Sequence, residues 1–114
     1  MFKKLILSAA LAGAMGVSGA AAQEVTLRVH HFLPAQAPVP SQFIEPWAQK
    51  VMDESDGRIA VEVYPAMSLG GGPPSLFDQA RDGVVDIIWT LTGYTPGRFL
   101  RAEVLDLPFI GGDA

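Results

Sequence analysis

The sequence predicts an α/β fold in which a mostly parallel sheet is flanked by helices. Residues 25–30 and 58–64 alternate between apolar and polar side chains, as strands with one buried face do. Residues 84–89 form a nearly continuous apolar run, which is typical of a strand buried on both faces. Helical patterns separate these segments, which gives the order strand, helix, strand, helix, strand. We therefore expect parallel strands joined by right-handed crossovers.

The first helix is predicted between the first two strands. Its buried face is indicated by six apolar residues at spacings of three and four: Phe43, Ile44, Trp47, Ala48, Val51 and Met52. Ser41 could cap the start of this helix. Pro46 requires either an irregular first turn or a helix that begins near Glu45. Gly57 is expected to end the helix in the left-handed conformation.

A glycine-rich segment, LGGGPPS (residues 69–75), leads into the second predicted helix, which ends at Gly83. A loop that binds phosphate could contain similar glycines, but it needs G-x-x-x-x-G-K-[ST] or G-x-G-x-x-G, and both patterns are absent. Pro73 and Pro74 also remove two of the N–H groups that would hold an anion at the helix start. We therefore interpret the segment as a turn with unusual backbone angles, followed by a helix that proline initiates.

Residues 1–22 have the three parts of a secretory signal peptide. A basic start with Lys3 and Lys4 is followed by a short apolar run and by an A-x-A exit that ends at Ala22. We expect cleavage after Ala22 and a periplasmic product of residues 23–114. An uncleaved membrane anchor is the alternative, but the apolar run is too short to span a bilayer. No later segment is long and apolar enough, so no membrane span is expected after cleavage.

The composition of residues 23–114 argues against several classes of partner. Without Lys3 and Lys4 the chain carries six basic and twelve acidic residues, a net charge of −6, and the acidic residues are spread along the sequence. Nucleic acids and anionic lipids require basic patches, so neither is an expected partner. Cysteine is absent, which excludes disulfide bonds and a lipid anchor on a cysteine.

Catalytic and metal-binding patterns are not evident in the sequence. His30 and His31 are the only histidines, and adjacent residues on a strand point to opposite faces, so they are not expected to share a metal. Asp86 could act as a base, but a buried acid bonded to backbone amides is the preferred interpretation. We therefore expect no enzyme, no metal site and no cofactor.

A candidate binding site follows from the geometry of a parallel sheet. Ligands bind outside the carboxyl ends of such strands, and the first and third predicted strands end at the same edge. The expected ligand-binding residues at this edge are His31, Phe32, Trp89, Thr90, Leu91, Thr92 and Tyr94. Aromatic rings with a few hydroxyls and one imidazole suit a small molecule. Packing is the alternative for each: Trp89 could belong to the core, His31 could order a loop, and Tyr94 could fix a turn.

Several motifs together resemble the solute-binding proteins of tripartite ATP-independent periplasmic (TRAP) transporters, of the dicarboxylate-binding (DctP-like) type. The matching segments follow the expected order: LRVHHFLPAQAP, FIEPWAQKVMDESDGRIAVEVYPAMSLGG, DGVVDIIW, YTPGRF and EVLDLPF. The set of DGRIAVEVYPAMSLGG followed by DGVVDI is more specific than any single motif.

The resemblance implies a protein of two α/β lobes that close over a small organic acid and deliver it to a membrane permease. It implies that residues 23–114 are an incomplete first lobe. It also implies that an arginine of the second lobe binds the ligand carboxylate, and Arg98 and Arg101 do not match that position. The first-lobe contacts of the family fall on the candidate residues above.

The candidate residues are largely apolar, so we hypothesise a monocarboxylate, or a 2-oxo or 2-hydroxy acid, with an apolar substituent. Two alternatives stay open from the residues alone. One is a binding protein of an ATP-driven or sensory system. The other is a periplasmic α/β enzyme whose catalytic residues lie beyond residue 114.

Overall fold

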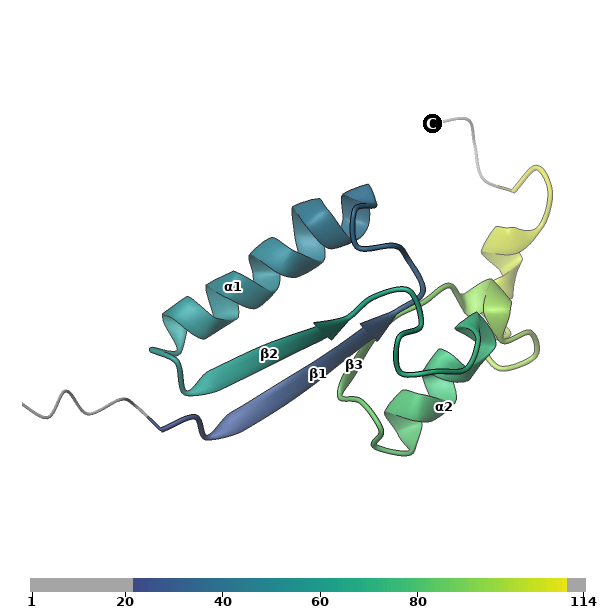
Figure 1. The fold of residues 1–114 in the computed structure, drawn as a ribbon. Helices are drawn as coiled ribbons and strands as arrows, with labels where there is room; N and C mark the ends of the chain where they lie inside the picture. Colours follow the sequence, from purple (N-terminus) through teal and green to yellow (C-terminus); the bar gives the residue numbers. More distant parts are fainter. Residues whose placement is uncertain (1–21, 111–114) are drawn as a thin grey trace, which may run out of the picture.

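The computed structural model describes residues 22–110 and confirms the predicted α/β fold. Its strands are β1 (Val25–His31), β2 (Ile59–Tyr64) and β3 (Ile87–Trp89), all parallel and in the order β2-β1-β3. The helices are α1 (Glu45–Glu54) and α2 (Leu76–Arg81). Helix α1 lies along one face of the sheet, and α2 lies beside β3 on the other side (Figure 1). Residues 1–21, which include most of the predicted signal peptide, lie outside the described range.

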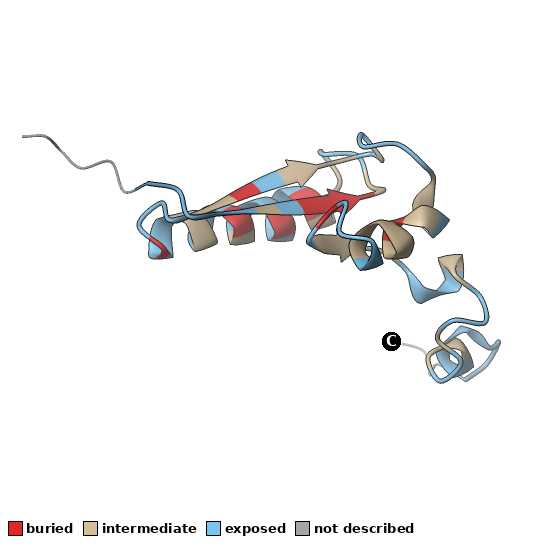
Figure 2. Cartoon of the chain, turned by 90° about the horizontal axis from the view of Figure 1, so that it is seen from below, coloured by how far each residue is buried: buried red, intermediate tan, exposed pale blue. Residues whose placement is uncertain are grey.

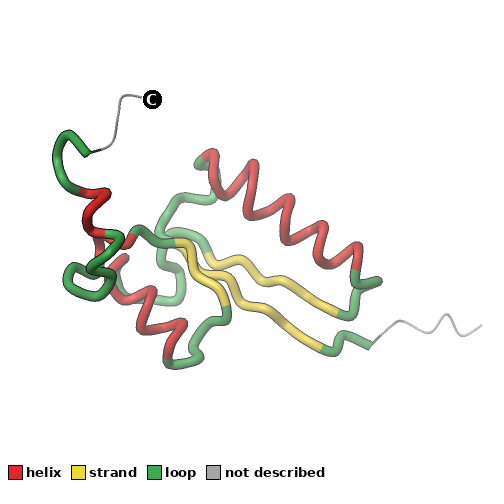
Figure 3. Tube along the Cα trace, turned by 180° about the vertical axis from the view of Figure 1, so that it is seen from behind, coloured by secondary structure: helices red, strands yellow, loops and turns green. Residues whose placement is uncertain are grey.

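The register of the sheet places the carboxyl ends of β1 and β3 together. Val29 pairs with Ile87, and His31 pairs with Trp89, at the end of both strands. Val29 packs with Ile44, Ala48 and Val61 in the core between the sheet and α1. His30 faces the other side, where its ring contacts Gln79 of α2. The two histidines therefore point to opposite faces, as predicted, and the tube view shows the two helices on either side of the strands (Figure 3).

Helix α1 begins at Glu45 after an irregular turn, as Pro46 led us to expect. A π-helical turn, Pro40–Ile44, runs directly into it, and Pro46, which has no N–H for the helical ladder, stands in the first turn of α1. The irregular start that the proline required is therefore present as a π-helical turn. The capping role suggested for Ser41 is wrong, because its hydroxyl donates 2.9 Å to the carbonyl of Ala37 and no side chain caps the turn. Gly57 adopts φ +75°, and its N–H bonds the carbonyl of Met52, which confirms the predicted end of the helix.

The apolar run at 84–89 is only partly a strand. Strand β3 contains Ile87–Trp89, and both Val84 (46% exposed) and Trp89 (37% exposed) contradict burial on both faces. Val84 precedes β3 in the connection from α2, and Trp89 is the last residue of β3, which pairs with β1 alone in the described sheet. Asp86 is also not buried. It accepts a hydrogen bond of 2.8 Å from the backbone N–H of Arg28, so the expected bond to a backbone amide is confirmed and the expected burial is not.

The glycine-rich segment is a turn with left-handed backbone angles. Gly70 and Gly71 have φ values of +91° and +80°, and a Cβ on Gly71 would collide with the hydroxyl of Ser75. A 3₁₀ turn, Pro73–Ser75, then leads into α2, whose first residue Leu76 is fully buried. The turn is therefore shaped by backbone conformation and close packing, in agreement with the interpretation from sequence.

Burial is concentrated where α1 faces the sheet. The buried residues include the inner side of α1, the carboxyl end of β1 and the middle of β2, while the segment after β3 is mostly exposed (Figure 2). That segment contains two 3₁₀ turns, Thr92–Tyr94 and Glu103–Asp106. Among residues 22–110, no helix combines the length and the apolar character that a bilayer crossing requires.

Candidate ligand-binding site

The predicted site residues lie at the carboxyl edge of the sheet. His31 and Trp89 are paired across β1 and β3, and the ring of Phe32 contacts that of Tyr94 edge to face at 5.2 Å between centroids. Thr90, Leu91 and Thr92 follow β3 directly and lead into the 3₁₀ turn that contains Tyr94. The structure thus brings the residues of the two strand ends together. Their contact with a ligand stays a prediction.

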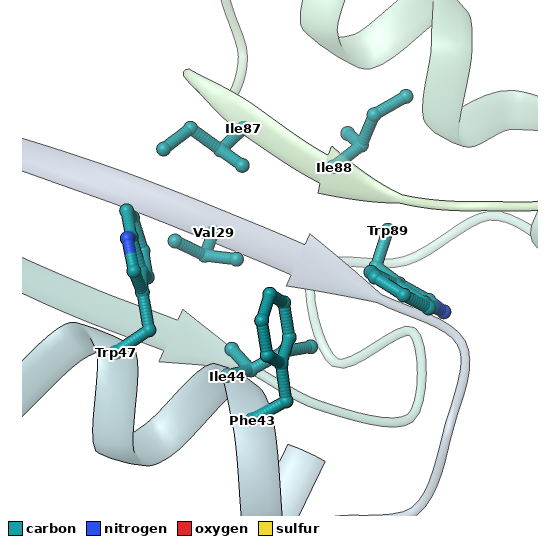
Figure 4. A pocket seen from close by; sticks show the side chains of 7 residues that line it. All are labelled: Val29, Phe43, Ile44, Trp47, Ile87, Ile88 and Trp89. Atoms are coloured by element: carbon teal, nitrogen blue, oxygen red, sulfur yellow. The ribbon is translucent and has the colours of Figure 1, made fainter. Parts of the chain in front are cut away.

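An apolar pocket of about 120 Å³ opens beside this edge, on the face that α1 covers (Figure 4). Its lining consists of Val29, Phe43, Ile44, Trp47, Ile87, Ile88 and Trp89. Val29 and Ile44 are almost completely buried, whereas Phe43 is 58% exposed and Trp89 is 37% exposed. The buried pair therefore forms the base of the pocket, and the two exposed rings stand at its mouth.

Two aromatic residues of this pocket were not among the predicted site residues. The helical spacing placed Phe43 and Trp47 in the core, but Phe43 is largely exposed and its ring lies 5.9 Å from that of Trp89 at an angle of 58°. A signal was present in the sequence. After a parallel strand the chain returns through a crossover helix, so the start of that helix must lie near the carboxyl edge of the sheet. Aromatic residues in its first turns are therefore candidates for the site.

His31 is the titratable group of the predicted site that is fully buried. Neither of its ring nitrogens has a hydrogen-bond partner among the described residues. Burial lowers the pKa of its imidazole below the ordinary value, because the charged form loses its hydration. The nearby backbone of Leu33 raises the pKa of His31 and so opposes this shift. The proximity of His30 lowers the pKa further, and the negative charge of Glu45 raises it more weakly. The net result is a neutral imidazole at neutral pH.

This burial predicts a loss of stability in mild acid. The unfolded chain binds a proton at His31 near pH 6.5, whereas the folded chain binds it only at lower pH. Stability should therefore be complete above about pH 6.5 and decrease as the pH falls below that value, because the unfolded state binds more protons. We expect the drop in Tm between pH 7.5 and pH 5 to be smaller in His31→Asn than in the unsubstituted protein. Equal drops in thermal unfolding scans would contradict this.

Charged groups do not line the apolar pocket. Arg98 is the first basic residue that follows the predicted site in the sequence. Its guanidinium bonds the carboxylate of Asp78 at 2.6 Å and lies over the ring of Phe77, 4.4 Å from the ring centroid. The hydrogen bond from Arg98 lowers the pKa of the Asp78 carboxyl, because it stabilises the ionised form. Arg98 is therefore held at α2, away from the pocket. In residues 22–110 no group of three or more His, Cys, Asp or Glu could hold a metal ion.

A protein-family comparison defines the class. The family "Bacterial extracellular solute-binding protein, family 7" (DctP) matches residues 29–114. The chain therefore belongs to the DctP family of solute-binding proteins, as the sequence resemblance predicted.

Solved structures of TRAP solute-binding proteins resemble the chain closely. One, from an unidentified marine microbe, is described as specific for aromatic acid ligands and contains metahydroxyphenylacetate. It is 56% identical with a TM-score of 0.74, over 80% of this chain and 29% of that protein. Another, from Rhodoferax ferrireducens T118, contains copurified benzoate. It is 57% identical with a TM-score of 0.69, over 74% of this chain and 26% of that protein.

A curated relative is more distant. The "Outer membrane transporter protein TsaT" of Comamonas testosteroni is 29% identical over 113 residues, which is 99% of this chain and 32% of that protein. The chain thus spans about a third of the length of the curated relative and less than a third of the two structures.

Proposed function

We propose that the chain contributes the first lobe of a periplasmic TRAP solute-binding protein whose ligand is an aromatic monocarboxylate. The observation that carries this proposal is the apolar, ring-lined pocket at the carboxyl edge of the sheet, with Phe43 and Trp89 at its mouth. Aromatic side chains around a small hollow favour a flat apolar group. The ligands of the two TRAP structures, metahydroxyphenylacetate and benzoate, have such a group.

The charge of the site argues against a dicarboxylate. Every residue that lines the pocket is apolar or aromatic, so a second carboxylate placed there would lose its hydration without gaining a cationic partner. A monocarboxylate avoids this cost if its ring enters the pocket and its carboxylate faces outward. A dicarboxylate ligand, which the family resemblance suggested, is therefore too specific an expectation for this chain. An acid with an apolar substituent fits the lining of the pocket better.

Binding would proceed by closure, with no bond made or broken. The residues of this lobe supply the apolar surface, and a second lobe would supply the cation that meets the carboxylate. Closure follows binding because contacts with both lobes form only in the closed state. Delivery to a membrane permease in the periplasm completes the proposal, and the family membership and the predicted signal peptide support it.

Calorimetric titration of the complete gene product tests the proposed ligand class. We expect benzoate and metahydroxyphenylacetate to bind at least about thirtyfold more tightly than succinate, because an unpaired buried carboxylate costs roughly 2 kcal/mol or more. Hexanoate serves as a monocarboxylate control without a ring. Tighter binding of succinate than of either aromatic acid would contradict the proposal.

A further inference from the structure

We infer that Phe43 determines specificity for the ring of the ligand, together with Trp89. This inference rests on the proposed function, and it adds a residue of the crossover helix to a site that was predicted from strand ends alone. The ring of Phe43 projects beside the pocket toward Trp89, across the end of β1 (Figure 4).

Phe43 is far more exposed than its apolar neighbours at the start of the helix. Ile44 is 4% exposed and Ala48 is 2% exposed, and both pack on Val29 in the core. Phe43 belongs to the same turn but leaves 58% of its surface exposed. Its ring therefore contributes less to the core than the adjacent residues do, and it is available to a ligand at the pocket mouth.

The geometry of the ring pair suits an aromatic guest. The two planes are inclined at 58°, with centroids 5.9 Å apart, so they diverge and do not stack flat on each other. A third ring can then meet one of them edge to face, as aromatic pairs prefer. The pocket volume of about 120 Å³ is of the size that holds a ring, since an apolar cavity of about 150 Å³ can hold benzene in another protein.

Phe77 offers a matched control on the other side of the sheet. Its ring forms a comparable pair with Phe99, at 5.3 Å between centroids, and it lies on α2. Replacing either phenylalanine by leucine removes one aromatic pair and retains an apolar side chain. Only Phe43 lines the pocket.

The test compares benzoate with cyclohexanecarboxylate, which has a similar size but no aromatic ring, in the complete gene product. We expect Phe43→Leu to weaken benzoate binding about three- to tenfold and to change cyclohexanecarboxylate binding less than about twofold, because only the first acid loses an aromatic contact. Phe77→Leu should change the ratio of the two affinities less than about twofold. Phe43→Tyr keeps the ring and should keep the ratio.

Each other outcome has a distinct meaning. Failure of the unsubstituted protein to bind any aromatic acid would overturn the proposed function. Normal benzoate binding with an unchanged affinity ratio in Phe43→Leu would overturn only the role of Phe43. If Phe43→Leu fails to fold, or loses both acids equally, Phe43 is a core residue and the inference is wrong.

Discussion

Replacing Trp89 by alanine is expected to weaken benzoate binding by about thirtyfold or more. Trp89 ends β3 at the carboxyl edge of the sheet, pairs with His31 in register, and contacts the ring of Phe43. A tryptophan that is partly exposed beside an apolar pocket offers a large rigid surface, and tryptophan is enriched among the residues whose truncation costs about 2 kcal/mol or more of binding free energy. Calorimetric titration of the complete gene product measures the change.

Trp89→Phe is the matched control for this substitution. It retains an aromatic ring at the same position, so most of the benzoate affinity should remain. Thermal unfolding of both variants separates binding from folding, because Trp89 is 37% exposed and lies at the edge of the described sheet. Unchanged benzoate affinity in Trp89→Ala would show that this residue belongs to the scaffold and not to the ligand site.

The second large effect concerns stability and depends on His30. Its ring is fully buried, and its Nδ1–H donates 2.6 Å to Oε1 of Gln79, because an amide oxygen can only accept. The N–H of Leu69 lies 3.4 Å from Nε2, and the amide of Gln79 donates to the carbonyl of Gly70 at 3.0 Å. This network joins the glycine-rich turn and α2 to β1, one residue before the candidate site.

His30→Ala is expected to destabilise the protein by about 2–4 kcal/mol. The substitution leaves a cavity, and it leaves polar groups of Leu69 and Gln79 without partners. A double-mutant cycle with Gln79→Ala should give a coupling free energy of about 1–2 kcal/mol, as residues of one buried hydrogen-bond network do. Denaturant unfolding of the unsubstituted protein, the two single variants and the double variant measures the coupling.

An exposed pair provides the control for this cycle. The amide of Gln49 donates 2.8 Å to Asp53 on the outer face of α1, one helical turn apart. Its coupling free energy should be about 0.3 kcal/mol, as for other exposed pairs at this spacing. A His30–Gln79 coupling no larger than that of the exposed pair would mean that the buried network does not hold the turn to the sheet.

Much of the fold could be predicted because it depends on local patterns. Alternation in the first two strands, the proline in the first turn of α1 and the left-handed Gly57 each act within a few residues of chain. The carboxyl-edge position of His31 and Trp89 also followed from the parallel order of the strands.

The errors concern burial, which depends on what covers a residue. Phe43 and Val84 match buried patterns, but 58% of Phe43 and 46% of Val84 are exposed. The apolar run at 84–89 predicted a strand buried on both faces, whereas the strand contains only residues 87–89 and Trp89 is 37% exposed. The periodicity of apolar residues indicates which face of a strand or helix points to the core. It does not indicate which other elements cover that face, so it cannot give the exposure of a residue.

The most direct test of the account is a crystal structure of the complete gene product with benzoate. We expect the benzoate ring within about 4.5 Å of the side chains of Trp89 and Phe43, the range of apolar contact, with its carboxylate turned away from the pocket. A ring bound elsewhere, with the pocket filled by side chains of the protein, would contradict the assignment of this hollow to the ligand.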